Sequence, residues 1–218
     1  MKKRKINFKI LIPIILLSII SIVTIYSALT YTSSTLGNLA LKQAIWYGIG
    51  WVLVYILVKL KNDYLYQHTW FLYIFGVILL ALLLVFGTPI NNSKCWFTIP
   101  GIGSIQPSEF MKIFIMLTLA TMIHNFRNDF TNPTLKDEFK FILKTFIIVL
   151  IPSILTFLQP DTGSIFIYLI IYFSMMFASG IRIRWFIVGF TILLLLFGGI
   201  LGLYFFLEDI FIKIFGTS

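Results

Sequence analysis

The sequence predicts an all-α integral membrane protein of about seven transmembrane helices, with the N-terminus inside and the C-terminus outside. Hydrophobic residues make up 59% of the 218 positions and charged residues only 11%, whereas a soluble domain carries about 25% charged residues. The apolar residues gather in runs long enough to cross a hydrocarbon core of about 30 Å, which takes about 20 helical residues. The basic residues fall mainly in alternate connections between these runs.

Each predicted span ends at a polar or helix-breaking residue. The first follows a basic start and is too long for a cleaved signal, so we expect a retained signal-anchor. The break between the fifth and sixth spans rests on Pro160, because proline ends one helix and suits the first turn of the next. We expect one membrane domain over residues 1–218, with spans at residues 10–31, 43–60, 69–87, 107–125, 140–158, 162–180 and 186–207.

The distribution of Lys and Arg predicts the orientation. Thirteen basic residues lie before the first span or in the even-numbered connections, and three lie in the alternate connections or the tail. Cytoplasmic connections carry the excess of positive charge, so the N-terminus is predicted inside. Residues 126–139, the most polar connection, are expected to be a solvated cytoplasmic loop.

Two classes of feature are excluded by composition. The net charge of +9 comes from short connections between spans rather than from one basic stripe, so we expect membrane lipids and no nucleic acid as partners. Cys95 is the only cysteine, which excludes an intramolecular disulfide.

The most informative stretch is residues 94–112, where a Gly- and Pro-containing loop carries charge into the fourth span. Glu109 and Lys112 are three positions apart, so they project from one helical face and can pair. Gln106 and Ser108 suit a helix start, and Glu109 suits the positive end of its dipole. A simple helix cap explains part of this pattern, but ionisable groups inside a span usually face a cavity or a partner. We favour a polar cavity.

A shorter version of this pattern surrounds Gln159 and Asp161 at the start of the sixth span. Asp161 is either a plain helix cap or part of the same outward-facing site. Two helix N-termini at similar depth favour anions, while the acids leave open a bound divalent cation or a role in orienting Lys94 and Lys112. No metal site is predicted from ligand spacing, and Trp96 fits an interfacial anchor as well as a binding residue.

Three stretches resemble the SEDS family of bacterial cell-wall proteins (shape, elongation, division and sporulation), with RodA nearest among RodA, FtsW and SpoVE. Residues 91–97 (Asn-Asn-Ser-Lys-Cys-Trp-Phe) look like the family's Asn-Gly-Ala-Lys/Arg-Ser/Arg-Trp segment. Residues 106–112 are similar to its Gln-Pro-Ser-Glu-x-x-Lys signature, and residues 159–164 to its Gln-Pro-Asp-x-Gly-Thr/Ser signature. Asn92 and Ser93 replace the usual Gly-Ala.

The resemblance implies a ten-helix fold, of which residues 1–218 are expected to be the N-terminal seven spans. It implies a peptidoglycan glycosyltransferase that acts on lipid II in cell elongation, shape control or division, in the bacterial cytoplasmic membrane. A class B penicillin-binding protein is the implied partner. The family's proposed catalytic Asp lies after the seventh span, so the catalytic residue is expected beyond Ser218.

The polar site implied by these motifs would hold the substrate rather than perform the chemistry. Lys94 is expected to contact the pyrophosphate or the lipid-linked sugar. Two alternatives use the same residues: a lipid II flippase, and a non-catalytic scaffold for a cell-wall synthase. The expected site residues are Lys94, Trp96, Gln106, Ser108, Glu109, Lys112, Gln159 and Asp161.

Overall fold

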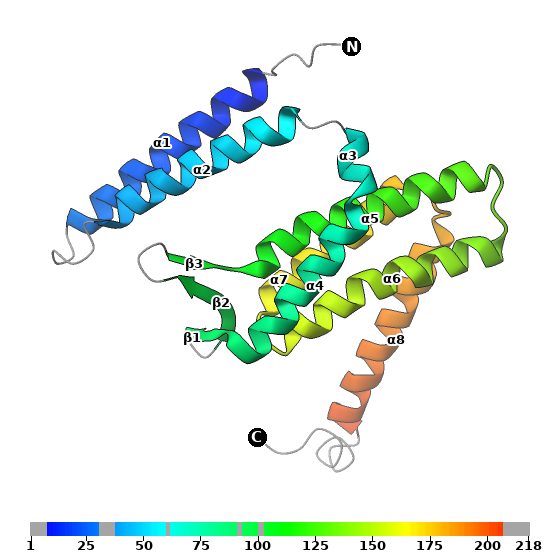
Figure 1. Ribbon diagram of the computed structural model, residues 1–218. Coiled ribbons are helices and arrows are strands. Elements are labelled where there is room, and N and C mark those ends of the chain that lie inside the picture. Colours follow the sequence, from blue (N-terminus) through cyan, green and yellow to red (C-terminus); the bar gives the residue numbers. More distant parts are fainter. Residues whose placement is uncertain (1–7, 31–37, 60–61, 91–92, 100–102, 207–218) are drawn as a thin grey trace. The chain divides into compact units, whose positions relative to one another are not determined.

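The computed structural model describes residues 8–30, 38–59, 62–90, 93–99 and 103–206, and is mostly helical (Figure 1). Its helices are α1 (Phe8–Thr30), α2 (Asn38–Lys59), α3 (Asn62–Gln67), α4 (Thr69–Phe86), α5 (Pro107–Asp129), α6 (Leu135–Phe157), α7 (Thr162–Ala178) and α8 (Arg184–Phe206). Its strands are β1 (Thr88–Ile90), β2 (Ser93–Ile99) and β3 (Gly103–Ile105).

The long helices of the described chain fall on the seven predicted spans, and the all-α membrane class is confirmed. Among the described residues, four helices are long and apolar enough to cross a membrane, over Phe8–Ala28, Leu39–Lys59, Thr69–Phe86 and Leu135–Phe157. Crossing by the other long helices and the inside–outside orientation stay predictions. The basic start, the C-terminal residues and Asn91-Asn92 of the first motif lie outside the described residues.

Contacts divide the chain into two compact units, so the single membrane domain also stays a prediction. The first unit contains α1, α2, α3 and residues 98–104. In it, α1 packs against α2 as an antiparallel pair (Figure 1). The second unit contains α4 to α8 with residues 69–97 and 105–218, and it carries every predicted site residue.

In the second unit α5 packs against α4, α6 and α7. The buried positions recur every three or four residues, which places them on one face of each helix. Several buried positions are polar, including Thr118, Thr145 and Ser164. Small and polar residues are common where membrane helices meet, because they allow close approach and bond across the contact. The Tyr73 hydroxyl, for example, donates to the Ile148 carbonyl oxygen at 2.9 Å.

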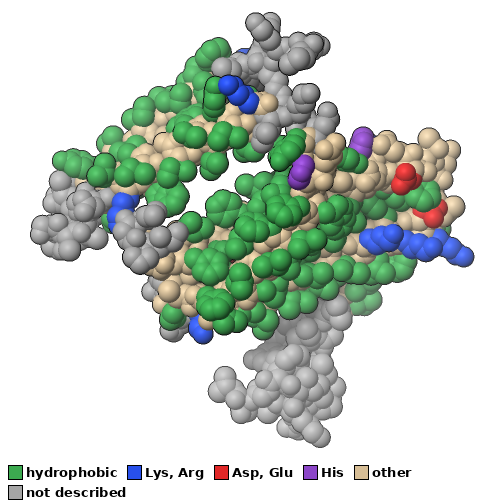
Figure 2. Space-filling model, in the orientation of Figure 1, with side chains coloured by type: hydrophobic (Ala, Val, Ile, Leu, Met, Phe, Trp, Pro, Cys, Tyr) green, Lys and Arg blue, Asp and Glu red, His purple; other side chains and the backbone are tan. Residues whose placement is uncertain are grey.

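The outer surface of the helices is apolar. Phe71, Ile74 and Val85 of α4 are exposed, although Leu80 and Leu83 of the same helix are buried. Hydrophobic side chains cover most of the described residues on the face that Figure 2 shows, and charged ones gather where α5 ends and α6 begins. An apolar exterior with polar contacts inside is what a lipid environment favours, since exposed apolar groups cost little there.

The connection before α5 differs from the expected loop, because it forms a three-stranded sheet in the order β1-β2-β3. Strands β1 and β2 are antiparallel, with Thr88 opposite Trp96. The Thr88 hydroxyl also donates to the Trp96 carbonyl oxygen at 3.0 Å. The local sequence carries the strand signal: buried Cys95 lies between the more exposed Lys94 and Trp96, which is the two-residue period of a strand.

The expected solvated loop over residues 126–139 is wrong for most of its length. Helix α5 continues to Asp129 and α6 already begins at Leu135. Thr134 and Asp137 form a capping box, in which each side chain bonds the backbone N–H of the other residue. This reciprocal bonding satisfies two free N–H groups at the helix start, so the polar residues here begin a helix rather than extend a loop.

Gly76 allows the close approach of α4 and α5. A Cβ added there would lie 2.6 Å from Met111 Sδ and 2.7 Å from Phe114 Cδ2. We expect Gly76→Val to lower the free energy of unfolding by about 1–3 kcal/mol through overpacking, measured by unfolding in mixed micelles. Gly198→Val is the control because a Cβ at Gly198 meets nothing within 4 Å. Equal stability of both variants would show that the α4–α5 contact tolerates added volume.

Candidate functional site

The N-terminus of α5 begins the candidate site. Gln106 is the N-cap residue and Pro107 follows in the first turn, as expected. Gln106 occupies the N-cap position, but its side chain makes no capping bond. Its amide Nε2 instead donates to Asp161 Oδ2 at 2.9 Å. The residue that opens α5 is therefore bonded to the residue that caps α7.

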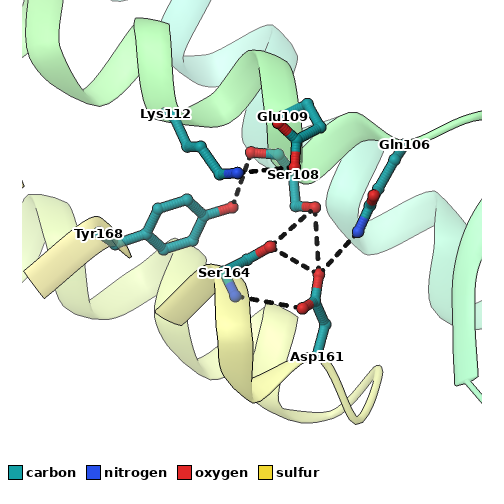
Figure 3. A network of polar contacts seen from close by, with 7 residues as sticks. All are labelled: Gln106, Ser108, Glu109, Lys112, Asp161, Ser164 and Tyr168. Atoms are coloured by element: carbon teal, nitrogen blue, oxygen red, sulfur yellow. Dashed lines mark hydrogen bonds and ion pairs between the residues drawn. The ribbon is translucent and has the colours of Figure 1, made fainter. Parts of the chain in front are cut away.

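Asp161 is the centre of a polar network shown in Figure 3. Its Oδ2 atom accepts from Gln106, from the Ser108 hydroxyl at 3.2 Å and from the Ser164 hydroxyl at 2.7 Å. Its Oδ1 atom accepts from the Ser164 backbone N–H at 3.1 Å. Asp161 is thus the N-cap of α7, as one prediction had it, and it also bridges to α5. That it belongs to an outward-facing site stays a prediction.

Two further residues complete the network. The Ser164 hydroxyl lies 3.3 Å from the Ser108 hydroxyl, and the Tyr168 hydroxyl donates to the Ser108 carbonyl oxygen at 3.2 Å. Sequence reasoning did not select Ser164 or Tyr168. Their positions three and seven residues after Asp161 place them on the capped face of one helix, a signal that was available.

Glu109 and Lys112 form the predicted ion pair. Lys112 Nζ lies 2.6 Å from Glu109 Oε1 (Figure 3), with side-chain exposures of 15% for Lys112 and 57% for Glu109. The described contacts keep this pair separate from the Asp161 carboxylate. That the pair faces a cavity stays a prediction.

We expect the pair to be weakly coupled, because Glu109 is more than half exposed. A double-mutant cycle of Glu109→Gln and Lys112→Met should give a coupling free energy of about 0.2–1 kcal/mol, from unfolding in micelles. A coupling of several kcal/mol would mean that other groups bury Glu109.

Strand β2 is fixed to the turn between α6 and α7 through Gln159. Ser93 Oγ and Cys95 Sγ both donate to the Gln159 carbonyl oxygen, at 2.7 and 3.1 Å. Gln159 is fully buried and its Nε2 donates to the Leu80 carbonyl oxygen at 2.8 Å. Lys94 lies between Ser93 and Cys95 in the strand, and its side chain is exposed. It takes part in none of the ion pairs of the described residues.

We expect the buried thiol of Cys95 to react slowly. Burial raises its pKa, opposed in part by a hydrogen bond with Ser93 and reinforced by the charge of Asp161. Only the thiolate is nucleophilic, so alkylation by N-ethylmaleimide should be slow at neutral pH and should keep rising above pH 9. A Lys94→Cys variant in a Cys95→Ser background should react at least about tenfold faster at neutral pH. Equal rates would contradict the burial of Cys95.

The predicted site residues therefore fall into three groups. Gln106, Ser108 and Asp161 meet in one network, Glu109 and Lys112 pair beside it, and the third group lies along β2 and its anchor. This third group is Lys94, Trp96 and Gln159. Across the described part of the chain no group of three His, Cys, Asp or Glu side chains is arranged to hold a metal ion.

The chain matches a known protein family. The model of the FtsW, RodA and SpoVE family, described as "Cell cycle protein", matches residues 8–213. The chain belongs to this family. The three short motifs that suggested it are the ones that build the Asp161 network and its anchor on β2.

Relatives within the family are similar but longer. A probable peptidoglycan glycosyltransferase FtsW of Hydrogenovibrio crunogenus is 31% identical over 67% of this chain and 36% of its own length. The peptidoglycan glycosyltransferase MrdB of Helicobacter pylori is 33% identical over 76% of this chain and 42% of its own length. The chain thus spans less than half the length of these two curated relatives.

Solved structures of the family share this fold. The rod shape determining protein RodA of Thermus thermophilus matches with a TM-score of 0.69 and 26% identity, over 87% of this chain and 59% of that chain. A chain from a peptidoglycan synthase complex that coordinates polymerization and crosslinking matches with a TM-score of 0.66 and 27% identity. This match covers 83% of the present chain and 51% of the chain from the complex. The helical membrane fold is therefore that of the family.

Proposed function

We propose that this chain forms the part of a peptidoglycan glycosyltransferase that binds lipid II, in the bacterial cytoplasmic membrane. The observation that carries the proposal is the meeting of the N-termini of α5 and α7 at Asp161, beside the strand that bears Lys94. Free N–H groups and dipoles at helix N-termini favour anions. The pyrophosphate of lipid II is such an anion, carried on a membrane lipid.

The charges divide between structure and binding. Three side chains donate to one oxygen of Asp161, and Glu109 is paired with Lys112, so both acids are compensated by their own neighbours. Lys94 is left as an exposed cation on β2. An ammonium group binds phosphate as a point charge, which fits Lys94 to the substrate pyrophosphate. By neutralising the pyrophosphate, Lys94 would also help it to leave as the lipid pyrophosphate when an acceptor sugar hydroxyl attacks the anomeric carbon.

The proposed partner is a class B penicillin-binding protein. The likeness to a chain of a peptidoglycan synthase complex supports this pairing. Glycan polymerisation and crosslinking act on the same product, so the two enzymes would work on one growing strand.

The test is polymerisation of labelled lipid II by the protein that carries this chain, followed on a gel. Lys94→Ala should reduce glycan product at least about tenfold, the usual value of one charge-assisted contact of about 1.5–3 kcal/mol. Lys144→Ala is the control, because Lys144 is an exposed cation on α6 away from the network. Full product from Lys94→Ala together with lost lipid II translocation would favour the flippase alternative.

A further inference from the structure

An apolar groove lies between α6, α7 and α8, and none of the residues of the Asp161 network lines it. Its volume is about 690 Å³. Its walls include Ile142 and Phe146 of α6, Tyr172 and Met176 of α7, and Phe186 and Gly189 of α8. A Cβ at Gly189 would meet no atom within 4 Å, so the groove is open along α8.

One end of the groove carries a cluster of charge. Trp185, which also lines the groove, donates from Nε1 to Glu138 Oε2 at 2.7 Å. Arg182 Nε lies 3.3 Å from Glu138 Oε1, and Arg184 Nη2 lies 4.0 Å from Glu138 Oε2. The Glu138 side chain is only 3% exposed, whereas those of Arg182 and Arg184 are 48% and 44% exposed. Two guanidinium groups therefore share one carboxylate and keep an excess positive charge.

The guanidinium groups retain bonding capacity for an anion. Arg182 also donates from Nη2 to the Pro133 carbonyl oxygen at 3.0 Å, which fixes its position. The contact of Arg184 with Glu138, at 4.0 Å, is loose. Each guanidinium carries five N–H donors in a planar fork that suits phosphate oxygens.

We propose that this groove binds one anionic phospholipid, with an acyl chain along α8 and the phosphate at Arg182 and Arg184. The apolar walls match an acyl chain, and the arginines complement a phosphate with net negative charge. Basic pockets between membrane helices bind anionic head groups, and tryptophan favours the head-group level. A further apolar helix would fill the groove but would leave the excess positive charge without a counter-ion, so charge complementarity selects the lipid. The proposal is independent of lipid II binding.

Trp185 is a natural reporter for this site. The protein is reconstituted into phosphatidylcholine vesicles that contain equal mole fractions of brominated phosphatidylglycerol or brominated phosphatidylcholine, since bromine quenches nearby tryptophan. A Trp185→Phe variant isolates the Trp185 signal from the other four tryptophans. From this quenching we expect the apparent affinity for brominated phosphatidylglycerol to exceed that for brominated phosphatidylcholine by about fivefold for each arginine that contacts the phosphate.

Two variants separate the head-group contact from the acyl-chain contact. Arg184→Gln should remove most of the preference for phosphatidylglycerol, while Lys144→Gln should keep it. Gly189→Leu should block the groove and reduce Trp185 quenching by both lipids, and Gly198→Leu should leave it unchanged because that position is equally open. Equal quenching by both lipids in the unmodified protein would overturn the proposal. A Gly189→Leu protein whose Trp185 is quenched as strongly as in the unmodified protein would overturn it as well.

Discussion

Replacing Asp161 by alanine should lower the free energy of unfolding by about 3 kcal/mol and abolish lipid II binding. The carboxylate accepts from Gln106, Ser108 and Ser164 and caps α7. Its removal leaves these donors without their acceptor, and a hydrogen bond to a charged group contributes about 1.5–3 kcal/mol. Loss of an N-cap adds about 1 kcal/mol. The N-termini of α5 and α7 would then no longer be held together.

The measurement is unfolding of the purified protein in mixed micelles, with Asp129→Ala as the control. Asp129 is an exposed carboxylate at the end of α5. The free energy of unfolding of Asp129→Ala should therefore lie within about 0.5 kcal/mol of that of the unmodified protein. Asp161→Asn should fall between the two, because its amide keeps one acceptor oxygen. If Asp161→Ala unfolds like Asp129→Ala, the network does not hold the two helices together.

Replacing Glu138 by alanine should lower the free energy of unfolding by about 2–3 kcal/mol. The change leaves the Trp185 Nε1–H without its acceptor and removes the counter-charge of Arg182 and Arg184. Breaking a buried ion pair costs about 3–5 kcal/mol, and the half-exposed arginines reduce this value because water solvates them. Glu138→Gln should cost about half as much, since it keeps an acceptor for Trp185. Identical unfolding of Glu138→Ala and the unmodified protein would show that the carboxylate does not join α6 to α8.

Local sequence patterns predicted the long helices of the described residues. Pro107 begins α5 and Pro160 lies between α6 and α7, as expected. Glu109 and Lys112 pair because three positions along a helix bring side chains together. The small sheet was missed because its strands are short, although the alternation around Cys95 was visible. The connection after α5 was misjudged because its polar residues cap a helix, and caps look like loops in composition.

Contacts between distant segments could not be predicted from local pattern. Nothing within residues 106–112 indicates that Gln106 bonds to Asp161 rather than capping its own helix, since the two are 55 positions apart. The burial of Glu138 likewise involves Arg182, from the connection after α7, and Trp185, from the start of α8. Pattern reasoning placed Glu138 in a solvated connection because a lone acidic residue there usually is solvated.

Equilibrium binding of labelled lipid II to the purified chain 1–218 in nanodiscs tests the central claim most directly. Saturable binding is expected, with an affinity at least about tenfold weaker in Lys94→Ala, no detectable binding in Asp161→Ala, and unchanged binding in Lys144→Ala. Competition by undecaprenyl pyrophosphate, but not by undecaprenol, would assign the contact to the pyrophosphate. Binding that is equally strong in Lys94→Ala and Asp161→Ala would contradict a lipid II site at the junction of α5, α7 and β2.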